Sequence, residues 1–219
     1  MQITHFGHSC VLVELEGARI LFDPGNFSHG FEGLTGLDAI LITHQHPDHC
    51  DTARLPNLIG ENPQAIRIAD PQTAAQLNSD DVAGEWTAAL AGGQVTVGSV
   101  TARFTGGRHA VIHPEIPVVD NVAYVLGTPT APGRFMHPGD SFYIPFEQID
   151  VLALPSAAPW MKLSESVDYL RAMAPRVAVP IHQAILSDAG TGVHYGRLSD
   201  MKDPGTEFVV LGEESATQV

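Results

Sequence analysis

Cysteine and positive charge are both scarce in this sequence of 219 residues. Cys10 and Cys50 are the two cysteines, which is too few for a scaffold held together by disulfide bonds. The chain has 11 lysine and arginine residues against 25 aspartate and glutamate residues, so its formal net charge is −14. A field of this sign repels polyanions, and we therefore expect neither nucleic acid nor an anionic membrane as a partner.

Long apolar runs are missing as well. Residues 1–7 contain His5 and lead directly into a strand pattern, with no charged leader and no long apolar segment. We therefore expect a soluble, cytoplasmic protein. Hydrophobic residues still make up 44% of the chain, enough for a substantial core, and the length predicts one compact domain over residues 1–219.

The most informative stretch is residues 38–51, where an apolar run ends in a cluster of metal-binding side chains. The run Ala39–Ile42 is typical of a short buried strand. The cluster that follows it consists of His44, His46, Asp48 and His49. His44 and His46 are two positions apart, so they point to the same side of an extended backbone. Three imidazoles and a carboxylate in so short a stretch suit a borderline ion such as Zn²⁺.

The rest of the chain predicts short strands alternating with a few helices. Further strands are expected over residues 2–6, 10–14, 19–22, 65–69, 94–97, 100–104, 122–126, 134–136, 151–154, 177–181 and 208–211. Helices are expected over residues 52–59, 71–77 and 164–173, the last capped by Ser164. Segments 26–36, 111–121 and 184–195 are expected to be loops that select the substrate, and 213–219 to be a frayed tail.

Several of these strands end at a potential metal ligand. Besides the cluster, these residues are Asp23, His109, Asp140 and His182. If the strand ends meet at one edge of a sheet, these side chains come together although they are far apart in the sequence. His113 competes with His109. His109 is favoured because it follows the turn at Gly106-Gly107, and His113 is then expected beside the ligands.

This combination of residues resembles the metallo-β-lactamase fold superfamily of metal-dependent hydrolases. The resemblance is carried by the motif His-x-His-x-Asp-His at residues 44–49, by Pro-Gly-Asp at 138–140 and by Pro-Ile-His at 180–182. The opening Gly-His-Ser-Cys at 7–10 and the short length are most similar to a small branch of uncharacterised hydrolases and relatives of ascorbate-6-phosphate lactonase. The resemblance implies an α/β fold, a four-layer αβ/βα sandwich, with a two-metal site at one edge.

The resemblance also implies a role for each matching residue. One ion would be held by His44, His46 and His109. The other would be held by Asp48, His49 and His182. Asp140 would bridge the two ions. Asp23 would orient a ligand histidine. The expected ions are two divalent cations, Zn²⁺ in preference to Mn²⁺ or Fe²⁺.

A pair of such ions activates a hydroxide that attacks an ester, a lactone or a phosphoester, and Asp48 is the candidate for orienting it and shuttling a proton. We therefore predict a hydrolase with a small-molecule substrate. A di-iron oxidoreductase is an alternative, although that branch usually has a carboxylate where His46 stands. A non-catalytic metal-binding module is a further alternative, disfavoured because all seven ligand positions are intact.

Other polar and aromatic residues have weaker assignments. Trp160 is a candidate wall of a substrate pocket, and Lys162 or Arg108 a candidate contact for an anionic group. His5 and His8 could contact the site from the N-terminal strands, and His29 and His194 could gate or contact the substrate. The favoured interpretation is hydrogen-bonded packing for His5 and His8 and solvated loop positions for His29 and His194, and His137 is interpreted as structural.

Overall fold

The computed structural model describes residues 1–82 and 84–219, and this part of the chain forms two seven-stranded sheets. The first sheet has the order β14-β1-β2-β3-β4-β5-β6 and the second the order β13-β12-β11-β10-β9-β8-β7. The strands of the first sheet are β1 Gln2–His5, β2 Val11–Leu15, β3 Ala18–Phe22, β4 Ala39–Ile42, β5 Ile66–Ala69, β6 Thr87–Ala88 and β14 Thr217–Gln218. Those of the second are β7 Gln94–Val97, β8 Val100–Gly106, β9 Val122–Thr128, β10 Ala131–His137, β11 Val151–Pro155, β12 Val177–Ile181 and β13 Glu207–Phe208.

The core lies between the two sheets because alternate residues of each strand point to the same side. In β4, Ala39 and Leu41 belong to the core shared by both sheets, whereas Ile40 and Ile42 face outward into a second apolar cluster. In β12, Val179 joins the shared core and Ala178 a third cluster on the other outer face. Both faces of these strands are therefore buried, as expected for apolar runs in parallel strands.

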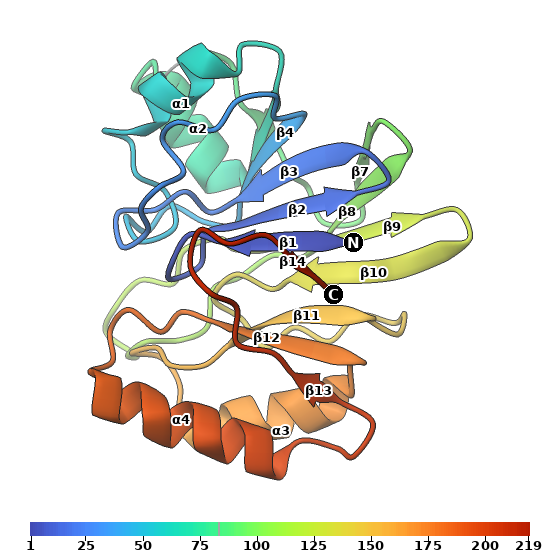
Figure 1. Cartoon of the computed structure of the whole chain (residues 1–219). Helices are drawn as coiled ribbons and strands as arrows, with labels where there is room; N and C mark the ends of the chain where they lie inside the picture. Colours follow the sequence, from blue (N-terminus) through green and yellow to red (C-terminus); the bar gives the residue numbers. More distant parts are fainter. Residues whose placement is uncertain (83) are drawn as a thin grey trace.

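Helices cover the two outer faces (Figure 1). They are α1 Leu55–Glu61 and α2 Pro71–Ser79 over the first sheet, and α3 Leu163–Met173 and α4 Asp188–Met201 over the second. Leu58 and Leu77 pack on the first sheet, and Leu170 and Leu198 on the second. The predicted four-layer αβ/βα sandwich is confirmed.

Three local predictions are wrong. The expected loop 184–195 contains the whole first half of α4. This helix begins after Ser187, whose side chain accepts a hydrogen bond from the backbone N–H of Gly190. Its glycines and weakly amphipathic pattern hid this helix. Helix α3 begins one residue before Ser164, because Glu165 accepts the backbone N–H of Lys162 instead. The expected frayed tail contributes β14, which pairs with β1.

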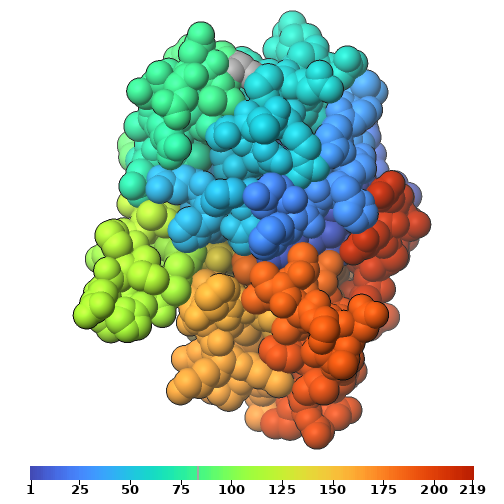
Figure 2. All heavy atoms as spheres, turned by 90° about the vertical axis from the view of Figure 1, so that its left-hand side faces the viewer, coloured from blue at the N-terminus to red at the C-terminus, as the bar shows by residue number. Residues whose placement is uncertain are grey.

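The strand directions gather the polar residues of interest at one edge of the sandwich. Strands β3, β4 and β5 are parallel to one another, and so are β10, β11 and β12. Their C-terminal ends are followed by the loops that carry the histidine motif and the later candidate ligands. Figure 2 looks onto this edge, where blue segments of the first half meet orange segments of the second half and a yellow-green loop between them.

Within residues 1–82 and 84–219, none of the helices has both the length and the apolar character required to cross a bilayer.

Candidate metal centre

Two groups of four metal-binding side chains adjoin each other at this edge. The first group is His44, His46, His109 and Asp140, and the second is His8, Asp48, His49 and His182. Within each group the ligand-type atoms lie within 4.8 Å of one another. All of these residues are buried except His46 and Asp48, which are partly exposed. Residues from the first 50 positions, from the middle third and from the last third of the chain thus assemble in one place.

The carboxylate of Asp140 lies between the two groups. Its Oδ1 is 3.2 Å from Nε2 of His49 and 3.2 Å from Nε2 of His182. Its Oδ2 is 3.2 Å from Nε2 of His109 and 4.0 Å from Nε2 of His44. Each carboxylate oxygen therefore faces a different set of imidazoles, which is the arrangement that a bridging ligand requires.

Hydrogen bonds donated by Nδ1 orient three imidazoles toward the centre. Nδ1 of His49 lies 2.7 Å from Oδ2 of Asp23. In His109 and His182, Nδ1 lies 2.5 Å and 2.6 Å from the backbone oxygens of Ala110 and Ala157. Since a carboxylate or carbonyl only accepts, Nδ1 carries a proton in each ring, and Nε2 is the nitrogen left to face the centre. A metal ion would bind each ring through Nε2.

Several inward-facing atoms are buried without a hydrogen bond. Among the described residues, Nε2 of His49, His109 and His182 and Oδ1 of Asp140 have no hydrogen-bond partner. The short distances between them are therefore contacts in poor hydrogen-bond geometry. Buried polar atoms are rarely left unpaired in native proteins. Imidazole nitrogens and a carboxylate that converge without pairing fit divalent cations.

Charge and burial act in opposite directions on the titratable groups. Burial disfavours the charged form of Asp140, but the nearby imidazoles of His182 and His49 outweigh it and hold the pKa of this carboxyl well below its usual range. Burial, with His49 adding to it, holds the pKa of His44 well below its usual value. Burial also opposes ionisation of Asp48, yet the hydrogen bond from His8 keeps its pKa low. Both carboxylates are therefore ionised at neutral pH.

The loop before Asp140 is shaped to place this side chain. Gly139 has φ +59°, and a Cβ there would lie 2.2 Å from Oδ1 of Asn121. That Asn121 oxygen accepts the backbone N–H of Asp140 at 2.9 Å. Trp160 donates its indole N–H to Oδ2 of Asp140. A side chain at residue 139 is excluded because the amide that holds Asp140 occupies its space.

The sequence comparisons agree with this geometry. A family model described as "Beta-lactamase superfamily domain" matches residues 2–182. The chain belongs to the beta-lactamase superfamily. This confirms the resemblance inferred from the motif, and the match includes every residue of the two groups.

Similar proteins cover between 63% and 99% of this chain. Protein Rv0786c of Mycobacterium tuberculosis is 59% identical over 216 residues, which is 99% of each chain. The UPF0173 metal-dependent hydrolase RL2074 of Rhizobium johnstonii is 33% identical over 146 residues, 63% of this chain and 58% of its own. The metallo-beta-lactamase fold protein YhfI of Bacillus subtilis superposes with a TM-score of 0.72 over 99% of this chain and 98% of its own at 16% identity. The last of these shows the same fold.

The other residues singled out in the sequence differ in their exposure and in their contacts with the candidate metal centre. His113 is exposed and accepts a hydrogen bond from the backbone N–H of Glu115, so its expected place beside the ligands is corrected. Trp160 is 9% exposed and contacts Asp140 directly instead of walling an open pocket. Lys162 is exposed. His194 is in α4, not in a loop, with its Nδ1 2.8 Å from the backbone oxygen of Ser156.

The sequence offered His8 as a possible contact of the site, but a packing role was favoured over membership of the second group. Its Nε2 is 3.0 Å from Oδ2 of Asp48, and its side chain is fully buried. An isolated histidine after glycine carries little information by itself. The available signal was its place in the turn after β1, at the same edge as the C-terminal end of the parallel strand β4.

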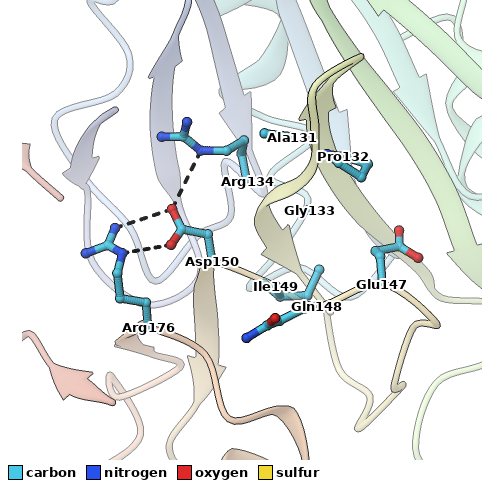
Figure 3. A pocket seen from close by; sticks show the side chains of 9 residues that line it. All are labelled: Ala131, Pro132, Gly133, Arg134, Glu147, Gln148, Ile149, Asp150 and Arg176. Carbon is cyan, nitrogen blue, oxygen red and sulfur yellow. Dashed lines mark hydrogen bonds and ion pairs between the residues drawn. The ribbon is translucent and has the colours of Figure 1, made fainter. Parts of the chain in front are cut away.

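Of two cavities in the structure, one is remote from the candidate centre and the other adjoins it. The larger, about 770 Å³, lies at the starts of β10, β11 and β12, where Asp150 pairs with Arg134 and Arg176 (Figure 3). It is at the end of these strands opposite the histidines. A cavity of about 450 Å³ instead borders His8 and the residue after His182, which makes it the one adjoining the candidate centre.

Proposed function

We propose that this chain is a metal-dependent hydrolase that cleaves a small ester, lactone or phosphoester. One observation carries the proposal: the Asp140 carboxylate lies between two sets of imidazoles, and Nε2 of His49, His109 and His182 and Oδ1 of Asp140 have no hydrogen bond among the described residues. The Rhizobium johnstonii relative is named a metal-dependent hydrolase, which supports the same activity here.

Two divalent ions would be held by side chains of both sheets. The proposed ligands are His44, His46 and His109 for the first ion, Asp48, His49 and His182 for the second, and Asp140 for both. Such ions, Zn²⁺ in preference to Mn²⁺ or Fe²⁺, lower the pKa of a water molecule and polarise the oxygen of the bond to be cleaved. Because both halves of the chain supply ligands, we propose that residues 1–219 act as one catalytic unit.

Asp48 is the proposed catalytic carboxylate. Its side chain is 21% exposed, whereas those of Asp140 and His182 are 4% and 1% exposed. It therefore faces the side from which a substrate and water arrive. Held in its ionised form, Asp48 accepts hydrogen bonds, so it would orient the attacking water and take up its proton.

The adjoining cavity favours an uncharged ester or lactone. Its lining, as far as the structure describes the chain, includes Phe27 and Leu186, two acidic residues, and no lysine or arginine. The acidic pair is Asp188 and Glu213, and Glu213 lies 3.2 Å from Nε2 of His29. A phosphate group in this cavity would meet carboxylates and no lysine or arginine, so the proposed metal ions alone would offset its charge, which raises the cost of its burial.

A phosphoester is the second candidate because of Arg108. This exposed residue precedes His109 and borders a separate hollow of about 390 Å³ with Ser141 and Tyr143. A guanidinium beside the first group of ligands is suited to a phosphate oxygen. If phosphoesters are the substrates, Arg108→Ala would raise their KM and leave that of neutral lactones unchanged.

The proposal is tested by elemental analysis of the purified protein together with a panel of neutral lactones, neutral esters and phosphodiesters. We expect two equivalents of divalent metal, hydrolysis that stops after chelation, and recovery when Zn²⁺ or Mn²⁺ is added back. Redox-active iron with no hydrolysis would instead support the oxidoreductase alternative. Failure to bind metal would overturn the proposal altogether.

A further inference from the structure

His8 has a contact with the second group that a packing residue does not need. It lies in the turn between β1 and β2, and its imidazole is fully buried. Nε2 of His8 is 3.0 Å from Oδ2 of Asp48. The ring also lies over that of His182, with a centroid distance of 3.9 Å. His8 therefore touches two of the proposed ligands of one ion.

The backbone around His8 is arranged to hold this position. His8 has φ +48°, in the left-handed region that residues with a side chain rarely adopt. Its carbonyl oxygen accepts the backbone N–H of His182 at 2.9 Å and lies 2.9 Å from Nε2 of His5. An unfavourable conformation persists where surrounding contacts enforce it, and such positions cluster at functional sites. The turn thus joins His8 to the end of β12.

The hydrogen bond with His8 is shorter than the contacts that Oδ2 of Asp48 makes with His182 and His49. Oδ2 of Asp48 is 3.6 Å from Nε2 of His182 and 3.8 Å from Nε2 of His49, both beyond hydrogen-bond length. Nε2–H of His8 is therefore the donor in position to fix the rotamer of Asp48. An ionised carboxylate accepts such a bond strongly.

We propose that His8 is a positioning residue that holds the Asp48 carboxylate in place at the second metal site. This inference rests on the proposed metal-dependent function and adds a residue to the seven ligands. It assigns His8 the role of donor, acting on the ion through Asp48. Residues that orient metal ligands in this way typically change metal affinity 10- to 100-fold when they are replaced.

A pair of variants of the same shape separates the donor role from packing and from direct ligation. His8→Gln places an amide N–H near the position of Nε2, whereas His8→Met has similar length and no donor. We expect His8→Gln to retain affinity for the second ion within about threefold, and His8→Met to lose about 10- to 100-fold. The first ion should bind both variants like the parent protein.

The measurement is a competition titration of the metal-free proteins with a chromophoric chelator, which resolves two binding steps without using activity. Ser9→Ala is the matched control, because it changes the buried side chain next to His8, and the Ser9 hydroxyl has no hydrogen-bond partner among the described residues. Thermal unfolding followed by circular dichroism establishes that each variant is folded. If the His8→Met protein does not fold, His8→Asn is used in its place, since its shorter amide does not reach the Nε2 position.

Two results would overturn the inference. Equal, strong losses in His8→Gln and His8→Met would make His8 a direct ligand, and unchanged affinities in both would make it a packing residue. Both are distinct from failure of the proposed function, in which the parent protein itself would bind no metal or hydrolyse no substrate in the panel.

Discussion

The indole N–H of Trp160 donates a hydrogen bond of 2.7 Å to Oδ2 of Asp140. The two residues are 20 positions apart, and Trp160 also packs edge-on against Phe142 with a ring-centroid distance of 4.9 Å. The tryptophan thus connects an aromatic cluster beside α3 to the carboxylate between the two groups of histidines. Its N–H stabilises one of the two Asp140 oxygens in a nearly water-free site.

Replacing Trp160 by phenylalanine should destabilise the metal-free protein by about 1.5–3 kcal/mol, because a buried carboxylate loses a donor. Trp86→Phe is the matched control, since Trp86 is also buried and donates its indole N–H to a neutral oxygen, the carbonyl of Val82. That variant should lose about 0.5–1.5 kcal/mol. Urea unfolding compares the two, and equal losses would argue against a charge-assisted bond at Trp160.

Asp140→Ala should abolish metal retention and hydrolysis together while the protein remains folded. The apolar cores between and outside the sheets do not include Asp140, so removal of its carboxylate leaves them intact. Elemental analysis after gel filtration reports bound metal, and far-ultraviolet circular dichroism reports the fold. Normal turnover in this variant would remove Asp140 from the centre.

Asp23→Asn should weaken metal binding about 10- to 100-fold without removing any proposed ligand. Asp23 accepts hydrogen bonds from the backbone N–H and hydroxyl of Thr43, both at 2.7 Å, and from Nδ1 of His49. An asparagine lacks the charge and the second acceptor that fix the proton on Nδ1. Asp38→Asn is the control, because Asp38 is exposed and accepts a hydrogen bond from the backbone of Arg19. Chelator competition should separate the two variants.

Ionisation of Asp70 should lower the free energy of unfolding as pH rises. Burial raises the pKa of this carboxyl to about 6, although the N–H groups of Gln72 and Thr73 at the start of α2 favour its charged form. Between the ordinary value near 4 and this raised value, the folded state binds more protons than the unfolded state. The stabilising contribution of the shift is therefore present below about pH 4 and lost as pH rises through about 6.

The effect amounts to roughly 2–3 kcal/mol at most. Asp70→Asn keeps an acceptor for α2 and cannot ionise, so its unfolding free energy should lack this decline. Urea unfolding at pH 4, 5, 6 and 7 measures the difference between parent and variant. A difference that is constant across these pH values would contradict the assignment.

The sequence predicted those residues of the centre that can be recognised from their neighbours in the chain. His44 and His46 are close together after a recognisable strand, so their grouping could be inferred without knowing the fold. His109 and His182 were found because each follows a strand, and parallel strands end at one edge of a sheet. For His8 a packing role was favoured, because its contact with the site depends on a left-handed backbone and on Asp48, which is 40 positions away.

Helix α4 shows where local patterns fail. Among the described residues of this helix, Leu198 alone is buried. Gly190, Gly192 and Gly196 lower the helix propensity of the segment. Neither a periodic apolar face nor favourable residues therefore marked it. Phe27 and Leu186, which line the adjoining cavity, lie in two of the segments expected to select the substrate, but the sequence could not show that these segments from opposite halves of the chain meet.

The pairing of β14 with β1 brings the two termini side by side. The backbone N–H of Val219 donates to the carbonyl oxygen of Met1 at 3.0 Å, and Figure 1 shows both ends close together. A short glycine-rich connector could therefore fuse them, and new ends could be opened in the exposed turn at Gly98 between β7 and β8. Such a circularly permuted protein would keep every histidine in its present surroundings.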